Sequence, residues 1–294
     1  MTTKPRRFRE LLAAPGILVL PGVFNGYSAR LVEAAGYRAA AISGAGVSET
    51  LLGWADRGVL GFDDNLRVCR ALADCTSIPL LADADTGYGN ALNVHFVVRA
   101  FEQAGLAAIS IEDQVWPKRC GHMAGKAVIP AGEMVQKVKA AADARRDADF
   151  VIRARTAAAA TDGVDAAIER LTLYAEAGAD IVMADALLSA ADIERVARYV
   201  PAKLAVNMGF GMIGRGTTPL LTPKQLQALG VSTVSYPRML TSAALRGMQN
   251  ALATFADLIE ADHTVERPDL LVPFDELNRL MGIDDLKALE DRFG

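Results

Sequence analysis

The sequence predicts a (β/α)₈ barrel, because short apolar segments of strand length alternate with longer helical segments eight times along the chain. Each predicted strand–helix unit spans about 25 to 45 residues, which is the scale of this barrel. Polar residues follow the carboxyl ends of most predicted strands, and active sites of this barrel collect at that face. A doubly wound open sheet is the alternative fold that the same alternation allows.

The first half of the chain contains four of the predicted units. Arg7 to Ala13 predicts a short helix, and the first strand is expected to close at Pro21-Gly22. Glu49 to Gly61 is predicted to be irregular, and Asp63 or Asp64 is expected to cap the next helix. The predicted strands are Ile17–Leu20, Arg38–Ile42, Ile78–Ala82 and Ala107–Ile111, and the predicted helices are Asn25–Ala35, the segment through Ala73, and about Ala91–Ala104.

The second half repeats the alternation without a linker that would divide the chain. Pro223 suits the first position of a helix, since proline has no N–H to leave unpaired there. The predicted strands are Phe150–Ala154, Ile181–Ala184, Leu204–Val206 and Val231–Ser235, and the predicted helices are about Ala131–Arg145, Gly163–Ala177, Ala190–Tyr199, Thr222–Leu229 and Leu240–Ala261.

The C-terminal tail is expected to be a separate helical appendage. We expect a barrel over residues 1–262 and the appendage over residues 263–294. Apolar residues recur at helical spacing in the tail, and an apolar stripe that follows a complete barrel needs a partner surface. We therefore expect a homo-oligomer, specifically a homotetramer. The stripe comprises Phe274, Leu277, Leu280 and Leu286.

Composition and charge exclude several classes of protein. With 51% hydrophobic and 22% charged residues over 294 positions, the chain is globular rather than disordered. The formal net charge is −4, so nucleic acid is not an expected partner. No apolar run approaches the ~20 residues that span a bilayer, so no membrane partner is expected. No apolar segment of a secretory signal follows the basic cluster Lys4, Arg6, Arg7 and Arg9.

The cysteines indicate a reducing compartment. Cys69, Cys75 and Cys120 do not have the spacing of a metal site. Cys69 and Cys75 lie on one predicted helix, where a disulfide between them would be geometrically awkward, so we interpret both as core-filling residues. We therefore expect a cytoplasmic protein.

Two neighbouring predicted strands end in carboxylates. Asp83 and Asp85 follow the third strand in LLADADTGYGN, and Glu112 follows the fourth. Carboxylate oxygens suit a hard cation such as Mg²⁺, which keeps several waters and needs few protein ligands. We predict Asp85 as the leading magnesium ligand, with Asp83 and Glu112 as direct or water-mediated partners. The alternative is that these acids mark the solvated ends of buried strands.

A loop with a thiol and several cations follows the fourth strand. Its residues are Lys118, Arg119, Cys120, Gly121 and His122. The neighbouring cations favour the thiolate form of Cys120, and the glycine-containing loop has the character of a lid over a substrate. A structural cysteine is the alternative.

Other polar residues at strand ends are candidates for substrate binding. Arg155 could grip a carboxylate bidentately or stabilise developing negative charge, and the alternative is a salt bridge at the barrel rim. Ser43 opens the loop after the second strand, where an ordinary turn serine is the alternative. Gly209 to Gly214 matches GxGxxG, but a dinucleotide site needs a helix directly after it and an acid about 20 residues on, and neither is present. We expect that loop to shape the pocket mouth.

DADTGYGN, EDQ and PKRCGH together resemble the signature of the isocitrate lyase and phosphoenolpyruvate mutase superfamily. The groups most similar to this chain are the methylisocitrate lyases, dimethylmalate lyases and carboxyphosphonoenolpyruvate mutase-like members. The resemblance implies that Asp83, Asp85 and Glu112 hold Mg²⁺, for which Mn²⁺ can substitute, against a 2-oxo acid. The family pattern has aspartate at Ala157 and often glutamate at Asp185, so this chain departs from it at two positions.

The resemblance also assigns roles to the loops. Ser43, Gly44 and Ala45 match a loop that offers a hydroxyl and backbone N–H groups to the substrate carboxylate, and Cys120 matches the acid/base cysteine. The expected catalytic residues are Cys120, Arg155, His122 and Lys118. The expected substrate contacts are Ser43, Gly44, Ala45, Asp56, Gly121, Arg155, Asp185, Asn207 and Tyr236.

We therefore expect a magnesium-dependent lyase that breaks a carbon–carbon bond in a 2-hydroxy di- or tricarboxylate by a retro-aldol reaction. Its products would be a 2-oxo acid and a second carboxylate. The alternatives left open are a phosphorus–carbon bond mutase or hydrolase, an oxaloacetate decarboxylase or hydrolase, and a barrel that binds a carboxylate without turnover. The resemblance further implies exchange of C-terminal helices between subunits.

Overall fold

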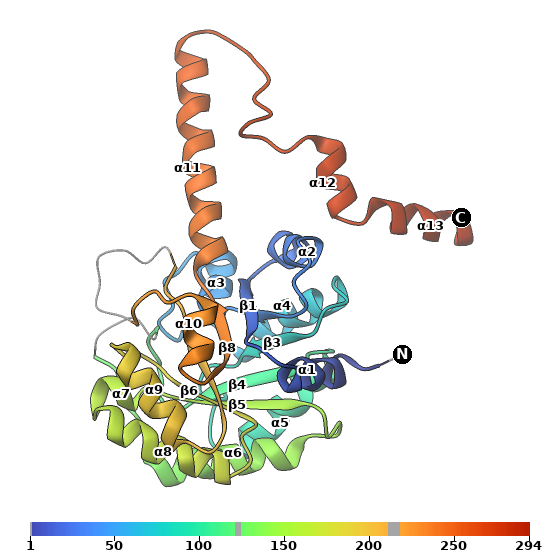
Figure 1. Ribbon diagram of the computed structural model, residues 1–294. Helices are drawn as coiled ribbons and strands as arrows, with labels where there is room; N and C mark the ends of the chain where they lie inside the picture. The colour runs from blue at the N-terminus through green and yellow to red at the C-terminus, as the bar shows by residue number, and fades with distance from the viewer. Residues whose placement is uncertain (1, 121–124, 211–217) are drawn as a thin grey trace.

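The computed structural model describes residues 2–120, 125–210 and 218–294 (Figure 1). Eight parallel strands close into a barrel in the order β1 to β8, so the (β/α)₈ prediction is confirmed and the open sheet is excluded. The strands are β1 (Leu18–Val23), β2 (Ala40–Ile42), β3 (Leu80–Asp83), β4 (Ala108–Glu112), β5 (Val151–Thr156), β6 (Ile181–Ala184), β7 (Lys203–Asn207) and β8 (Val231–Tyr236).

Helices follow the strands and surround the barrel, as predicted to within a few residues. The sequence analysis missed α7, a single turn after β5. The helices are α1 (Lys4–Ala13), α2 (Gly26–Ala34), α3 (Gly44–Val47), the π-helix η1 (Ser48–Leu52), α4 (Phe62–Asp74), α5 (Ala91–Gln103), α6 (Ala131–Ala144), α7 (Ala158–Thr161), α8 (Val164–Glu176), α9 (Ala190–Tyr199), α10 (Pro223–Ala228), α11 (Met239–Glu260), α12 (Phe274–Leu280) and α13 (Ile283–Phe293).

Strand β1 does not end at Pro21-Gly22, as the sequence had suggested. It continues to Val23, with Pro21 opposite Tyr236 and Gly22 opposite Ala41. A Cβ at residue 22 would lie 2.6 Å from the Cα of Pro237, so only glycine lets the end of β1 pass this close to the backbone after β8. Glycine here serves close strand approach rather than a turn.

Two local predictions near the second strand were also wrong. Residues 49–52 are not irregular, because α3 and η1 continue directly from Ser43. The N-cap of α4 is Gly61, without a side-chain hydrogen bond, and Asp63 and Asp64 lie in the first turn instead. In the first turn their negative charges interact favourably with the positive end of the helix dipole. Aspartate is common both at this place and at the N-cap, so the sequence alone does not distinguish the two positions.

The barrel interior is divided into an apolar lower part and a polar upper part. Phe8 and Leu12 of α1 cover the amino-terminal end and pack with inward-facing residues such as Leu20, Leu81 and Val151. The side chains that project inward above this layer are polar, and several of them are buried. This division places ionisable side chains at the carboxyl ends of the strands, where the fold collects functional residues. The buried polar residues that project inward from the strands are Ser110, Glu112, Arg153, Arg155, Thr233 and Ser235.

The C-terminal segment projects away from the barrel. Helix α11 extends outward, and the tail returns through α12 and α13 (Figure 1), so the prediction of a helical tail is confirmed. Thr241 is the one buried side chain of α11, and Leu252 is 69% exposed. The tail touches the barrel layer at α2, where Arg30 Nη1 donates a hydrogen bond to the Leu280 carbonyl over 3.5 Å. No helix in the described parts of the chain is both long and apolar enough to cross a membrane.

Candidate active site

A small cavity lies at the carboxyl ends of the strands and has a volume of about 50 Å³. Its lining combines residues from strands and loops that are far apart in the sequence. Eight of the predicted site residues contribute to its wall. These are Ser43, Ala45, Asp56, Asp83, Cys120, Arg155, Asp185 and Asn207, the last at the end of β7. The predicted residues Gly121 and His122 lie outside the described residues.

Five further predicted residues, Gly44 among them, lie outside the cavity wall. Asp85, Glu112 and Lys118 are buried and reach it through contacts with lining residues. Tyr236 is not among the lining side chains, whereas its neighbour Ser235 is. Successive side chains of a strand point to opposite faces, so only one of these two neighbours can face inward.

The loop after β2 is held close to β3. The Ser43 hydroxyl oxygen caps α3 by accepting a hydrogen bond from the Gly46 N–H over 3.2 Å, and the side chain also lines the cavity. A Cβ on residue 44 would lie 2.9 Å from Asp83 Oδ2. Glycine at this position therefore lets the loop backbone approach the Asp83 carboxylate, which the resemblance alone had not explained.

Lys118 forms a buried ion-pair triad with two carboxylates. Its Nζ lies 2.6 Å from Asp56 Oδ1 and 2.8 Å from Asp85 Oδ1, and its side chain is 3% exposed. Burial disfavours the ammonium, but Asp85 and Asp56 outweigh burial and raise the pKa of Lys118 well above its usual range. The triad joins the loop after η1, the turn after β3 and the loop after β4.

Asp85 sits in an unusual backbone conformation, with φ of 50°. Its carbonyl accepts a hydrogen bond from the Glu112 N–H over 2.8 Å, and its own N–H donates to Asp83 Oδ1 over 3.2 Å. Burial raises the pKa of the Asp85 carboxyl to about 7, although Lys118 opposes the shift. Its Oδ1 is buried and accepts no well-aligned hydrogen bond from the described residues, despite the proximity of Lys118.

Arg155 is held between two carboxylates from neighbouring strands. Its Nε lies 3.2 Å from Glu112 Oε2 and donates to Asp185 Oδ2 over 2.7 Å, and Nη2 also donates to Asp185 Oδ2. Burial opposes the charge of Arg155, but Asp185 and Glu112 outweigh it and raise its pKa. Burial also raises the pKa of Glu112, against the effect of Arg155. Asp185 therefore reaches Arg155 although the family pattern has a side chain one methylene longer.

Cys120 is half-buried and lines the cavity with Asp83 and Arg155. Its N–H donates to the Asp56 carbonyl over 3.2 Å, which ties the two loops together. Gln114 holds the backbone of Arg119, the residue before Cys120. Its side-chain amide donates a hydrogen bond to the Arg119 carbonyl over 2.9 Å and accepts one from the Arg119 N–H over 3.1 Å. Sequence reasoning missed this role of Gln114, although it belongs to the EDQ motif.

Asp113 of the same motif is a structural hub. It is fully buried and accepts hydrogen bonds from Thr156 Oγ1 over 2.6 Å, the Ala157 N–H over 3.0 Å and the Tyr174 hydroxyl over 2.8 Å. Arg170 Nη1 lies 3.2 Å from it as its counter-ion. Ala157, where the family pattern has aspartate, thus faces this hub rather than the cavity wall.

The predicted metal-binding carboxylates do not form a metal site with three protein ligands. In the described ranges, no group of three or more His, Cys, Asp or Glu side chains could hold a metal ion. Glu112 is engaged by Arg155 and by Gln114 Nε2 at 2.9 Å, and Asp85 is engaged by Lys118. The residues nevertheless fit Mg²⁺, since this ion is often held by one or two carboxylates with waters, and the Asp83 and Asp85 carboxylates are hard oxygen donors.

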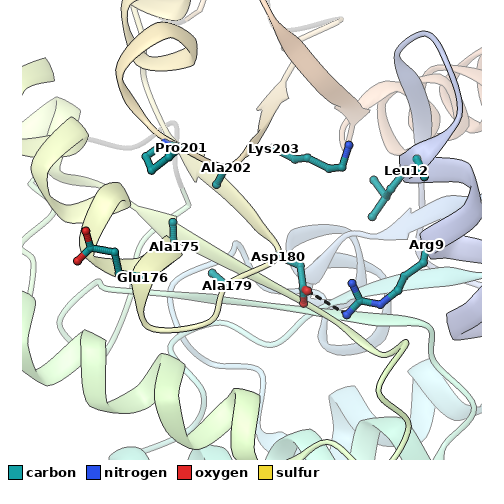
Figure 2. A pocket seen from close by; sticks show the side chains of 10 residues that line it. Arg9, Leu12, Ala175, Glu176, Ala179, Asp180, Pro201, Ala202 and Lys203 are labelled. Carbon is teal, nitrogen blue, oxygen red and sulfur yellow. Dashed lines mark hydrogen bonds and ion pairs between the residues drawn. The ribbon is translucent and has the colours of Figure 1, made fainter.

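A larger pocket of about 590 Å³ lies at the opposite end of the barrel (Figure 2). It is formed between α1, the end of α8 and the start of β7, and Arg9 crosses it to bond Asp180 over 2.9 Å. Six of its ten lining residues are alanine, leucine or proline, and the Asp180 carboxylate is already paired with Arg9 and Arg145. We therefore assign the chemistry to the smaller cavity, where unlike charges and a thiol meet.

Comparison with known proteins agrees with this geometry. Residues 8–256 match the family described as phosphoenolpyruvate phosphomutase. The 2,3-dimethylmalate lyase of Eubacterium barkeri is 38% identical over 98% of this chain and 97% of its own length. The 2-methylisocitrate lyase of Escherichia coli is 39% identical over 88% of this chain and 85% of its own length.

Solved structures show the same relationship. A crystal structure of a 2,3-dimethylmalate lyase, described as a member of the PEP mutase/isocitrate lyase superfamily, aligns with a TM-score of 0.91 at 29% identity, over 100% of this chain and 96% of the other. A phosphonopyruvate hydrolase in complex with oxalate and Mg²⁺ aligns with a TM-score of 0.84 at 30% identity, over 99% of each chain.

Proposed function

The chain belongs to the phosphoenolpyruvate phosphomutase family of the PEP mutase/isocitrate lyase superfamily, and we propose that it is a magnesium-dependent carbon–carbon lyase. Its substrate is a 2-hydroxy di- or tricarboxylate, such as 2-methylisocitrate or a dimethylmalate-like acid. The observation that carries the proposal is the meeting of Asp83, Arg155 and Cys120 in one cavity at the carboxyl ends of the strands. Similarity to two named lyases at 38% and 39% identity supports it.

Asp85 would be the leading ligand of Mg²⁺, with Asp83 and Glu112 as direct or water-mediated partners. The bound ion would act as a Lewis acid that stabilises negative charge on the substrate oxygens. Lys118 favours the ionised form of the Asp85 carboxyl and orients it, because its ammonium lies 2.8 Å away in a buried site. The complex of a similar hydrolase with oxalate and Mg²⁺ supports this metal for the present site.

The chain's own groups would bind and protonate the substrate. The Ser43 hydroxyl oxygen accepts from Gly46 N–H, which leaves its proton for a substrate carboxylate beside the N–H groups of Gly44 and Ala45. Arg155 stabilises the negative charge that develops as the carbon–carbon bond breaks. Cys120 then gives its proton to the carbon of the departing carboxylate enolate.

The remaining site residues orient this reaction. Asp56 and Lys118 fix the Cys120 loop, Asp185 fixes Arg155, and Asn207 contributes an amide to the cavity wall. Gly121 and His122, which lie outside the described residues, and Tyr236, which does not line the cavity, stay predicted substrate or catalytic residues. The positions of Cys69 and Cys75, on and directly after the single helix α4, support a reducing, cytoplasmic setting, because a disulfide between them would be geometrically awkward.

Cleavage or transfer at a phosphorus–carbon bond is the second candidate function. The similarity to a phosphonopyruvate hydrolase at 30% identity over 99% of the chain favours it. Both reactions need a metal-held 2-oxo acid, so the cavity would serve either. The departing group distinguishes them, since a carboxylate leaves the 2-oxo acid in the lyase reaction and a phosphoryl group leaves it in the phosphonate reaction.

A substrate panel tests the proposal. Derivatives of malate, citrate, isocitrate and methylisocitrate should be assayed for release of pyruvate, glyoxylate or oxaloacetate, with Mg²⁺ and with EDTA. Metal-dependent release of a 2-oxo acid supports the lyase. Conversion of a phosphonate, followed by phosphorus NMR, would instead support the second candidate. Binding of 2-oxo acids without turnover on either panel would leave a non-catalytic carboxylate-binding barrel.

We further propose a homotetramer in which residues 263–294 form an appendage to the barrel of residues 1–262 and pack on a neighbouring subunit. The unpartnered apolar side chains of α11 and α13 support this, since exposed apolar stripes of this length need cover. Leu252 and Phe255 are 69% and 61% exposed on α11, and Phe293 is 75% exposed on α13.

A further inference from the structure

Arg153 is a buried arginine on the floor of the cavity. It precedes Arg155 by two residues on β5, so both side chains point into the barrel, above Val151 of the apolar layer. The residue is 5% exposed and lines the cavity. The sequence analysis treated it as an ordinary strand residue.

The guanidinium of Arg153 lacks a carboxylate partner, in contrast to Arg155. Its Nε donates to Ser110 Oγ over 3.0 Å, and no ion pair joins it to a carboxylate of the described residues. Its Nη1 is buried and has no hydrogen-bond partner there. Burial lowers the pKa of Arg153 to about 10, and the nearby Asp83 only partly opposes this effect. A buried charge in this state is costly unless a ligand completes its hydrogen bonds.

A hydroxyl in the same cavity wall is unsatisfied as well. Ser235 on β8 is 2% exposed, lines the cavity, and its buried Oγ has no partner among the residues that the structure describes. Thr233, two residues earlier, has an equally unpaired Oγ1 but does not line the cavity. Val234 between them packs in the outer core, which confirms that the two hydroxyls face inward.

We propose that Arg153 and Ser235 form a floor subsite for a second carboxylate, carried by the 2-oxo acid fragment of the substrate. This inference rests on the proposed function. Arg153 Nη1 and the Ser235 hydroxyl are both donors, and a carboxylate accepts from both at once. The first carboxylate of the same fragment binds at Ser43, at the rim of the cavity. A fragment that presents only hydrogen or methyl to the floor leaves the guanidinium unpaired.

A 2-oxo diacid should therefore bind more tightly than the matching monoacid, which adds a class of substrate to the 2-methylisocitrate and dimethylmalate-like acids, whose 2-oxo product is a monoacid. A hydrogen bond to a charged group contributes about 1.5–3 kcal/mol, which corresponds to about 10- to 100-fold in affinity. The second carboxylate should strengthen binding by that factor.

Calorimetric titration in the presence of Mg²⁺ tests the subsite. The probes are two pairs that differ only in the second carboxylate: oxomalonate against glyoxylate, and 2-oxoglutarate against 2-oxobutyrate. Wild-type protein should prefer the diacid of at least one pair by about 10- to 100-fold. Arg153→Met should remove this preference while monoacid binding stays within about twofold, since it deletes only the charged donor.

Matched variants separate the subsite from a structural role. Ser235→Ala should reduce the diacid preference severalfold. Thr233→Val, two residues earlier on β8 and outside the cavity wall, should leave the preference unchanged. Arg153→Met should keep or raise the melting temperature without ligand, because an apolar side chain replaces an unpaired buried charge. If Arg153→Met does not fold, Ser235→Ala against Thr233→Val decides the question.

Two results would overturn the inference. One is equal affinity of wild-type protein for both members of each pair, which leaves the proposed function intact. The other is an unchanged diacid preference in folded Arg153→Met, which would make Arg153 a structural residue. If wild-type protein binds none of the four acids with Mg²⁺, the proposed function itself fails, and the inference fails with it.

Discussion

Lys118 Nζ lies 2.8 Å from Asp85 Oδ1, and both side chains are 3% exposed. This pair joins the loop that carries Cys120 to the turn that carries the predicted metal ligands. The two parts of the site are thus coupled through a buried charge rather than through the substrate alone. Because Asp56 shares the same ammonium at 2.6 Å, removing Lys118 would leave two buried carboxylates without a cation.

Lys118→Met should destabilise the fold. Breaking a buried ion pair by removing one partner typically costs about 3–5 kcal/mol, since the remaining charge is uncompensated. Urea unfolding followed by circular dichroism, in EDTA, would measure the free energy of unfolding. The exposed Lys139→Met on α6 serves as the control. Adding Asp85→Asn to Lys118→Met should recover part of the loss, and equal stability of Lys118→Met and wild type would contradict the triad.

Activity should require a divalent cation held by Asp85. EDTA should abolish turnover of the best substrate and Mg²⁺ should restore it, because the carboxylate oxygens of the site are hard ligands. Asp85→Ala should lose both the activity and its restoration by Mg²⁺. Full activity of Asp85→Ala in excess chelator would show that no metal acts at this position.

Gly44→Ala should weaken binding of oxalate in the presence of Mg²⁺. The new Cβ would lie 2.9 Å from Asp83 Oδ2, so either the loop or the carboxylate must move. A misplacement of this kind can cost up to about 100-fold at an active site. Calorimetry would measure the change, with Gly26→Ala as the control, since a Cβ there meets nothing within 4 Å. Unchanged affinity would mean that Asp83 is free to shift.

The barrel could be predicted because buried parallel strands are continuous apolar runs and their ends are polar. Ile181–Ala184 agrees with β6 at both ends, and the other strands shift by a few residues. Strand β1 was cut short since Pro21 and Gly22 usually signal a turn, whereas here glycine serves close approach to Pro237. A local signal cannot distinguish these uses, because the second one depends on a strand more than 200 residues away.

The sequence predicted which residues form the site, but it did not predict which of their side chains contact one another. The sequence places Asp83, Glu112 and Arg155 at strand ends, and the fold brings them to one face. The sequence does not show that Lys118 forms an ion pair with Asp85. Nor does it show that Arg153 hydrogen-bonds Ser110 and has no carboxylate partner among the described residues. These contacts depend on side-chain direction inside a closed barrel, which the alternation of a single strand does not fix.

Cys120 should carry proton transfer. General acid catalysis contributes about 10²–10⁴-fold, so Cys120→Ser should lower kcat by that factor. Magnesium-dependent binding of a product such as pyruvate should stay nearly unchanged, because the lost interaction belongs to the transition state. Cys75→Ser and Cys69→Ser on or beside α4 should keep kcat near wild type, since neither lines the cavity. Full kcat in Cys120→Ser would make this cysteine structural and would favour the phosphonate reaction or a binding role.

The protein should be a tetramer held together through α11 and the tail. Leu245, Met248, Leu252 and Phe255 follow helical spacing on α11 and are all more than half exposed, with fractions of 56%, 57%, 69% and 61%. Burying this stripe against a neighbour stabilises the assembly by roughly 25 cal/mol per Å² of apolar surface. Light scattering at micromolar concentration should therefore report four times the mass of one 31.2 kDa chain.

A charge placed on the stripe should dissociate that assembly. Leu252→Glu combined with Phe255→Glu puts two carboxylates where apolar contact is expected, and desolvating them would outweigh the remaining contact. Asn250→Glu is the matched control, because two residues along a helix leads to its opposite side, away from the stripe. The barrel of the double variant should stay folded, since these side chains are exposed in the single chain. A wild-type mass of one chain, or a double variant of unchanged mass, would place the subunit contacts elsewhere or remove them.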